Sequence, residues 1–173
     1  KSSSESHSDA DDVSNDSCRV NADELRCKMI GEGGNLGFTQ AGRIEYAMLG
    51  GRVNTDAVDN SGGVDMSDHE VNLKILLAQL TGDGTLTESQ RNDTILRLTD
   101  EVADQVLKNN SEHTRQISLD RLRSLSDIMP FAQAMNWVTQ EEGSSTAEMH
   151  LPDSRALVQR AKARQGLTRP ELS

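Results

Sequence analysis

The sequence predicts an α/β region that passes into an all-helical region, with helices dominating the chain overall. Up to about residue 82, short apolar segments alternate with glycine-rich loops and a helix, and the order strand, loop, helix, strand is typical of α/β proteins. Beyond residue 83 the apolar residues recur only at helical spacing. Aromatic residues make up 2% of the 173 residues, so we expect a thin, aliphatic core.

Two domains are expected, with the boundary at the glycines near residue 82. Residues 1–82 form the predicted mixed α/β part, and residues 83–173 form the predicted helical part. The first part begins with residues 1–17, which are rich in Ser and Asp and nearly free of apolar side chains. Such a composition cannot offset the entropy that ordering costs, and it predicts a flexible acidic arm.

The α/β part holds two candidate strands, at residues 25–30 and 52–58. Between them lie a glycine-rich loop at residues 31–37 and a helix that Thr39 can cap. The loop has two interpretations. It contacts a nucleotide, because glycines let the backbone approach a pyrophosphate at a helix N-terminus, or it is a plain glycine turn. Leu36 stands where the G-x-G-x-x-G pattern has its third glycine, so both interpretations stay open.

The most hydrophobic helix of the chain is expected to begin at Ser67, with Glu70 as the second member of a capping box. Its apolar residues lie on nearly all sides, which predicts a buried helix. The Ser67 hydroxyl can bond to the backbone of its own helix, or it can face a ligand anion at the positive helix end.

Helix-start patterns continue through the C-terminal half. Thr87 and Thr168 are each followed three residues later by Gln or Glu, so both predict a capped helix start. Pro130 interrupts an apolar pattern of helical spacing, and we expect it to kink or restart the helix.

The charge of the chain limits its partners. The formal net charge is −10 and the pI is near 4.8, which argues against nucleic acid and against anionic membranes. No run of some 18 apolar residues is present, so we expect no membrane span and a cytoplasmic protein. Cys18 and Cys27 lack the spacing of a zinc site or a disulfide framework, and reduced thiols are expected.

One group of side chains has the composition of a metal site: Asp65, Asp68, His69 and Glu70. Three of them are consecutive and therefore lie on different sides of a helical turn. Acids are also favoured in a first helical turn by the helix dipole. We therefore favour capping acids, and we expect no metal.

The stretch from Gly31 to Leu77 resembles the signature segment of the large NAD-specific glutamate dehydrogenases of bacteria. The resemblance continues through Lys1–His7, Leu86–Asn110 and Gly166–Leu172. A fainter similarity links the same stretch to the smaller glutamate, leucine and phenylalanine dehydrogenases, whose motifs match residues 32–35 and 60–70.

This resemblance implies that residues 1–82 are the C-terminal part of a Rossmann-like, dinucleotide-binding domain. It also assigns site residues. Gly33, Gly34, Asn35 and Asn60 would contact the nicotinamide and its ribose, and Ser67 would bind the distal carboxylate of glutamate. The family's catalytic lysines and aspartate have no counterpart in this segment, so no catalytic residue is assigned.

The implied function is a fragment of an enzyme that converts L-glutamate, NAD and water to 2-oxoglutarate, ammonia and NADH. We expect the fragment to be inactive alone and the parent enzyme to be a homo-oligomer. The alternative is a non-catalytic helical module that serves regulation or subunit contacts.

Overall fold

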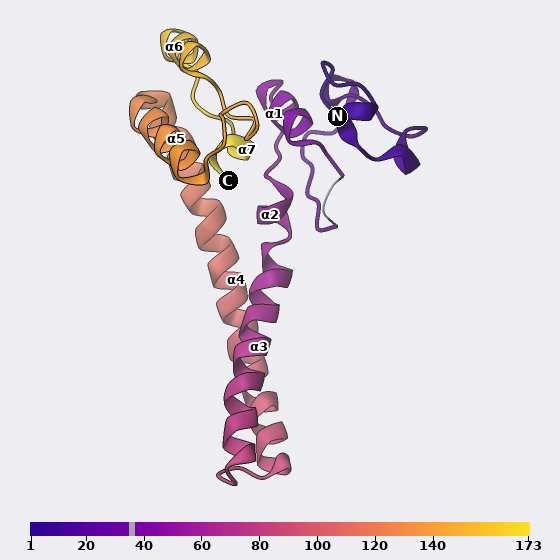
Figure 1. Cartoon of the computed structure of the whole chain (residues 1–173), viewed down its shortest axis with the longest axis vertical. Helices are drawn as coiled ribbons and strands as arrows, with labels where there is room; N and C mark the ends of the chain where they lie inside the picture. The colour runs from indigo at the N-terminus through magenta and orange to yellow at the C-terminus, as the bar shows by residue number, and fades with distance from the viewer. Residues whose placement is uncertain (35–36) are drawn as a thin grey trace. The chain divides into compact units, whose positions relative to one another are not determined.

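The computed structural model describes residues 1–34 and 37–173, and every regular element in this part of the chain is a helix (Figure 1). Three short 3-10 helices come first: η1 (Ser8–Ala10), η2 (Val13–Asn15) and η3 (Ala22–Glu24). The α-helices follow: α1 (Gln40–Met48), α2 (Asp56–Asp59), α3 (Ser61–Gly82), α4 (Glu88–Ser126), α5 (Met129–Glu142), α6 (Ser154–Lys162) and α7 (Arg169–Leu172).

The α/β expectation, and with it the partial Rossmann-like domain, is wrong: the described residues contain no β-strand. The two segments expected as strands meet at a single parallel bridge between Met29 and Arg52. The Ile30 N–H donates to the Arg52 carbonyl over 2.9 Å, and the Arg52 N–H donates to the Lys28 carbonyl over 3.0 Å. Parallel strands are stable in sheets of several strands with helices on both faces. A single pair of short segments does not provide that environment.

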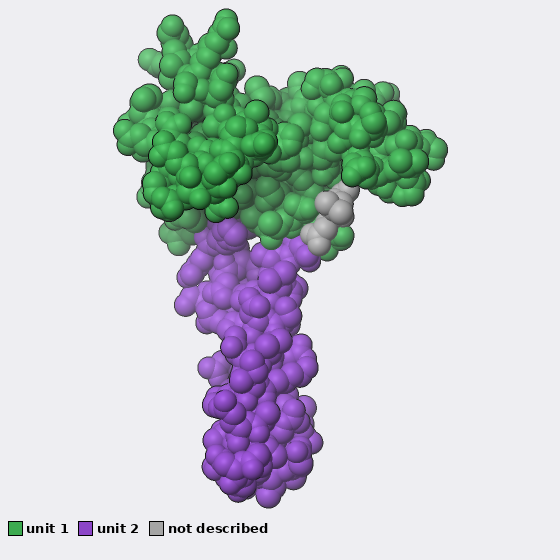
Figure 2. Space-filling view, viewed as in Figure 1, with its two compact units in different colours: residues 1–59, 115–173 green, residues 60–114 purple. Residues whose placement is uncertain are grey.

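The chain divides into two compact units (Figure 2). Unit 1 consists of residues 1–59 and 115–173, and unit 2 consists of residues 60–114. These compact units describe how this chain packs, and they do not divide a longer protein into domains. The predicted domain boundary between residues 82 and 83 therefore stays a prediction.

In unit 1, α1 packs against η3 and α7. The core on this side of the unit is formed by Tyr46, Ala22 and Val53. The Tyr46 hydroxyl donates to the Cys27 carbonyl over 2.7 Å, and burial raises the pKa of the Tyr46 phenol. Gly51 passes directly beside this ring, where a Cβ atom would overlap it. Glycine at position 51 is therefore a packing requirement of this core.

A second apolar cluster of unit 1 lies where α5 and α6 meet the C-terminal segment. Its buried members are Ile128, Met135, Leu157 and Leu167. The predicted restart of the helix at Pro130 is confirmed, because α4 ends at Ser126 and α5 carries the proline in its first turn. A proline is tolerated there, since the first N–H groups of a helix have no intrahelical partner.

The first residues of the chain are anchored to unit 1, in contrast to the flexible arm expected for residues 1–17. The Lys1 carbonyl accepts from the Ala22 N–H over 2.9 Å. The Ser3 N–H donates to Glu45 of α1 over 2.6 Å. Composition did not show these partners, because they lie some 20 to 40 positions away in the sequence.

In unit 2, α3 and the first part of α4 run antiparallel and side by side (Figure 1). The Asn109 amide donates to Asp65 over 2.9 Å, and the Ser61 hydroxyl donates to the Asn110 side chain. Near the turn, the Leu86 N–H donates to the Leu80 carbonyl over 3.0 Å. Hydrogen bonds thus join the two helices at one end and order the turn at the other.

The expected burial of α3 is wrong. Leu77 is buried, whereas Val71, Ile75 and Leu76 are 52%, 56% and 53% exposed. The apolar residues of α3 lie on all sides of the helix. Within unit 2, α4 packs beside α3 and covers only one of these sides, so the apolar residues on the other sides stay exposed.

In the described residues, no helix has the length and apolar content needed to cross a membrane.

Candidate functional site

The glycine-rich loop at residues 31–37 belongs to unit 1 and leads into α1. Gly33 and Gly34 are exposed, and a Cβ atom at either position would have no neighbour within 4 Å. The backbone of these two residues is therefore open to a ligand. Asn35, the third predicted cofactor contact of the loop, lies outside the described residues. Thr39 caps α1 as predicted, since its hydroxyl accepts from the Gly42 N–H over 3.1 Å.

The loop is held by Glu32 and a buried arginine. Arg43 of α1 is 1% exposed, and its guanidinium forms an ion pair with Glu32. The other Glu32 oxygen accepts from the Gly37 N–H over 2.8 Å. The Arg43 guanidinium also donates to the Asn54 carbonyl over 3.0 Å and lies 5.5 Å from the centre of the Phe38 ring. These contacts compensate a charge that would otherwise be costly to bury.

The same network reaches the end of α2. The Glu32 N–H donates to Asp59 over 3.0 Å, and the Asn54 amide donates to the other Asp59 oxygen over 2.9 Å. The Arg169 side chain donates to the Asn54 side-chain oxygen over 2.6 Å. Asp59 directly precedes Asn60 in the chain. The glycine loop is thus hydrogen-bonded to the residue before the second predicted motif.

Asn60 is the residue before the first turn of α3, and its carbonyl accepts from the Gly63 N–H over 3.1 Å. The helix therefore begins six residues before the predicted start at Ser67. Residues 61–63 form the first turn of α3, so the positive end of the helix dipole lies there. Because of this position, a helix-terminus anion site would lie beside Asn60.

Ser67 lies two turns into α3, so the capping box expected at Ser67 and Glu70 is wrong. The Ser67 hydroxyl donates to the Val64 carbonyl over 2.8 Å, and the side chain is exposed. Glu70 forms an ion pair with Lys74 instead. A separation of seven residues corresponds to two helical turns, so Asn60 and Ser67 lie on the same side of α3, about 10 Å apart along its axis.

Within the described residues, no group of three His, Cys, Asp or Glu side chains could hold a metal ion. Asp65 and His69 form a pair at 3.5 Å. Asp65 also accepts from Asn109, on the neighbouring helix. These contacts do not gather the acids of residues 65–70 around a common point.

The structure adds residues that the sequence patterns did not indicate. Arg43, Asn54 and Asp59 hold the glycine loop, yet none of them belongs to the two motifs at residues 32–35 and 60–70. The one sequence signal for Arg43 was its place in a short predicted helix that also holds a Tyr and is followed by two Gly. For an arginine in such a helix, a solvent-exposed side chain is the simpler interpretation. Chemically, unit 1 offers an exposed glycine backbone, and unit 2, described by itself, offers a helix N-terminus and the Ser67 hydroxyl.

The chain is similar to a known family of enzymes. The family model described as "Bacterial NAD-glutamate dehydrogenase, catalytic domain" matches residues 1–120. This match covers the glycine loop, the start of α3 and Ser67.

Three curated relatives carry the name "NAD-specific glutamate dehydrogenase". The protein of Pseudomonas aeruginosa is 46% identical over 173 residues, that of Halomonas elongata is 44% identical over 174 residues, and that of Mycobacterium tuberculosis is 43% identical over 173 residues. Each alignment includes 100% of this chain and 11% of the relative. The chain therefore spans about one ninth of the length of these relatives.

Replacement of Arg43 by Met should lower the free energy of unfolding by about 3 kcal/mol, because it leaves the largely buried Glu32 without its cation. Urea denaturation followed by the fluorescence of Trp137 measures this, since the single Trp of the chain belongs to unit 1. Arg26→Met is the matched control, because Arg26 is exposed. A double-mutant cycle of Arg43→Met with Glu32→Gln should show a coupling above about 1 kcal/mol. Additive effects of the two substitutions would contradict the ion pair as the cause.

Proposed function

Since the chain belongs to the bacterial NAD-glutamate dehydrogenase family, we propose that it is a piece of a longer enzyme that oxidises L-glutamate with NAD. In this reaction L-glutamate, NAD⁺ and water give 2-oxoglutarate, ammonium and NADH. The observation that carries the proposal is the match of the family model to residues 1–120. A cytoplasmic location and a homo-oligomeric state of the longer enzyme stay predictions.

The proposed contribution of the glycine loop is to contact the nicotinamide and its ribose through Gly33, Gly34 and Asn35. The open space around the first two residues supports this assignment, because a ligand can approach their backbone closely. Asn60 is proposed as the contact from the second motif. NAD, when bound, accepts the hydride from the Cα atom of glutamate, and the residues of this chain position the cofactor for that transfer.

Ser67 is proposed to bind the distal carboxylate of glutamate. Its exposed hydroxyl lies on the same side of α3 as Asn60, and the two residues could contact neighbouring ligands along one helix face. The hydroxyl can turn from the Val64 carbonyl to a carboxylate at the cost of one hydrogen bond to the helix backbone. A hydrogen bond to a charged group is the stronger of the two.

A second candidate function is a non-catalytic contact module, and the exposed apolar side chains of unit 2 favour it. Five large apolar residues of α3 are more than 40% exposed: Val64, Met66, Val71, Ile75 and Leu76. Val64, Val71 and Ile75 lie on one side of α3, at spacings of seven and four residues, and exposed apolar patches are typical of interaction sites. The two functions are compatible, since a catalytic piece can also contribute to a subunit contact.

The isolated 173-residue chain should form no NADH from L-glutamate and NAD, since the aligned relatives are about nine times longer than this segment. Absorbance at the NADH band measures this directly, with the full-length enzyme as the positive control. Turnover by the isolated chain would contradict the proposal that it supplies only part of the cleft.

In the full-length enzyme, Ser67→Ala should lower kcat/KM for L-glutamate about 10- to 100-fold, because one hydrogen bond to a charged group is lost. The loss should appear mainly in KM. The weaker activity on L-norvaline, which lacks the distal carboxylate, should stay unchanged. Ser89→Ala, another exposed serine in a helix of unit 2, is the control. Equal losses on both substrates would exclude a contact to that carboxylate.

If the contact module is correct, the isolated chain should form a dimer of twice 18.9 kDa in light scattering. Ile75→Ser combined with Leu76→Ser should return it to a monomer, because both side chains are more than half exposed on α3. Val13→Ser, at a residue that is 82% exposed in unit 1, is the matched control. A strict monomer at high concentration would rule out self-association through α3.

A further inference from the structure

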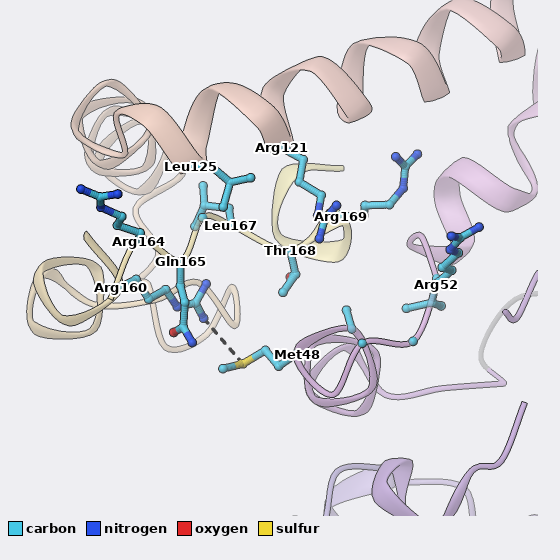
Figure 3. A pocket seen from close by; sticks show the side chains of 15 residues that line it. Met48, Arg52, Arg121, Leu125, Arg160, Arg164, Gln165, Leu167, Thr168 and Arg169 are labelled. Carbon is cyan, nitrogen blue, oxygen red and sulfur yellow. Dashed lines mark hydrogen bonds between the residues drawn. The ribbon is translucent and has the colours of Figure 1, made fainter. Parts of the chain in front are cut away.

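Unit 1 contains a pocket of about 480 Å³ that lies outside the proposed cofactor and substrate contacts (Figure 3). Its walls come from the end of α1 and the segment after it, from the end of α4, and from residues 160–169. Five arginines line it: Arg52, Arg121, Arg160, Arg164 and Arg169. None of its lining residues is Asp or Glu. A volume of this size is typical of small-molecule sites.

The concentration of positive charge is unusual for this chain. The net charge of the whole sequence is −10, yet residues 154–169 contain five Lys or Arg and no Asp or Glu. All five positions belong to the last two helices or the loop between them, and three of the five line the pocket. The positive charge around the pocket is therefore confined to this part of an otherwise acidic chain.

Two of the pocket arginines have partners. The Arg160 guanidinium donates to both oxygens of Glu171, over 2.8 and 2.7 Å. This carboxylate is buried beside the pocket and neutralises Arg160. Arg169 donates to the Asn54 side chain and to the Ser118 hydroxyl, over 2.6 and 2.7 Å. Arg160 and Arg169 are therefore held in the walls of the pocket by bonds to the protein.

Arg52, Arg121 and Arg164 differ, because within the described residues their guanidinium groups have no ion pair and no hydrogen bond. Figure 3 shows the Arg121 side chain extending from α4 toward Thr168, whereas Arg164 extends away from the other arginines. Arg52 borders the pocket from the segment after α1. Two unpaired guanidinium groups, Arg52 and Arg121, thus remain as candidate ligands.

Arg121 lies close enough to Arg169 for the two charges to interact. The pKa of the Arg169 guanidinium is lowered by burial and by the nearby charge of Arg121, while Asp59 acts in the opposite direction. Repulsion between like charges disfavours this arrangement without a counter-charge. An anion between the arginines would remove the repulsion.

We propose that this pocket binds a small phosphate-bearing anion through Arg52 and Arg121. Guanidinium groups present paired N–H donors that match the oxygens of a phosphate. The position of the two arginines on different walls favours a ligand with two phosphoryl groups over a single phosphate. Because the pocket shares no residue with Gly33, Gly34, Asn60 or Ser67, the bound anion would act as an effector and not as a substrate.

The test is isothermal titration calorimetry of the 173-residue chain with pyrophosphate at constant ionic strength. Arg52→Gln and Arg121→Gln should each weaken binding at least tenfold, and sulfate should bind at least tenfold more weakly than pyrophosphate. Arg26→Gln, which removes the same charge from an exposed site of unit 1, should leave the affinity unchanged. Trp137 fluorescence checks that each variant is folded.

Three results would overturn the proposal: no binding of pyrophosphate, equal weakening by Arg26→Gln, or displacement of pyrophosphate by NAD. The last result would make the pocket part of the cofactor site. The same titration with the full-length enzyme should give a similar affinity, and loss of binding there would show that a segment of the longer protein occupies the pocket. These measurements record binding and not turnover, so their failure is distinguishable from failure of the proposed dehydrogenase function.

Discussion

The buried ion pair between Arg43 and Glu32 is the interaction on which the arrangement of unit 1 depends. Arg43 is 1% exposed, and its charge is balanced by Glu32, the Asn54 carbonyl and the Phe38 ring. A guanidinium without these partners would be expelled to the surface, because burying an unpaired charge costs several kcal/mol. The glycine loop, α1 and the segment that leads into α3 are therefore fixed together.

The sequence was informative wherever the structure is determined locally. Thr39, Thr87 and Thr168 begin helices as predicted, since a cap depends on residues within three positions. The break at Pro130 has the same origin, because it follows from the chemistry of one residue. Local patterns failed for the start of α3. Residues 61–66 are helical, although Gly62 and Gly63 favour a loop.

Features that depend on distant partners could not be predicted. Residues 25–30 and 52–58 have a strand-like composition, but strands form only where further strands and covering helices are present. The exposure of Ile75 and Leu76 has the same reason, since composition shows that a helix is apolar and not what covers it. At the candidate site, the resemblance identified the motifs. Arg43 and its partner Asn54 were missed because neither belongs to a pattern of fixed spacing.

The distribution of charge connects the two inferred sites. A chain with a net charge of −10 repels anions at long range, so an anionic ligand is held only where local donors outweigh this field. The proposed carboxylate contact at Ser67 provides one hydroxyl donor on α3, and the pocket of unit 1 provides unpaired guanidinium groups. A single hydroxyl donor suits one carboxylate, whereas guanidinium groups suit a more highly charged ligand. An acidic protein can thus separate two classes of anionic ligand by the kind of donor that each one meets.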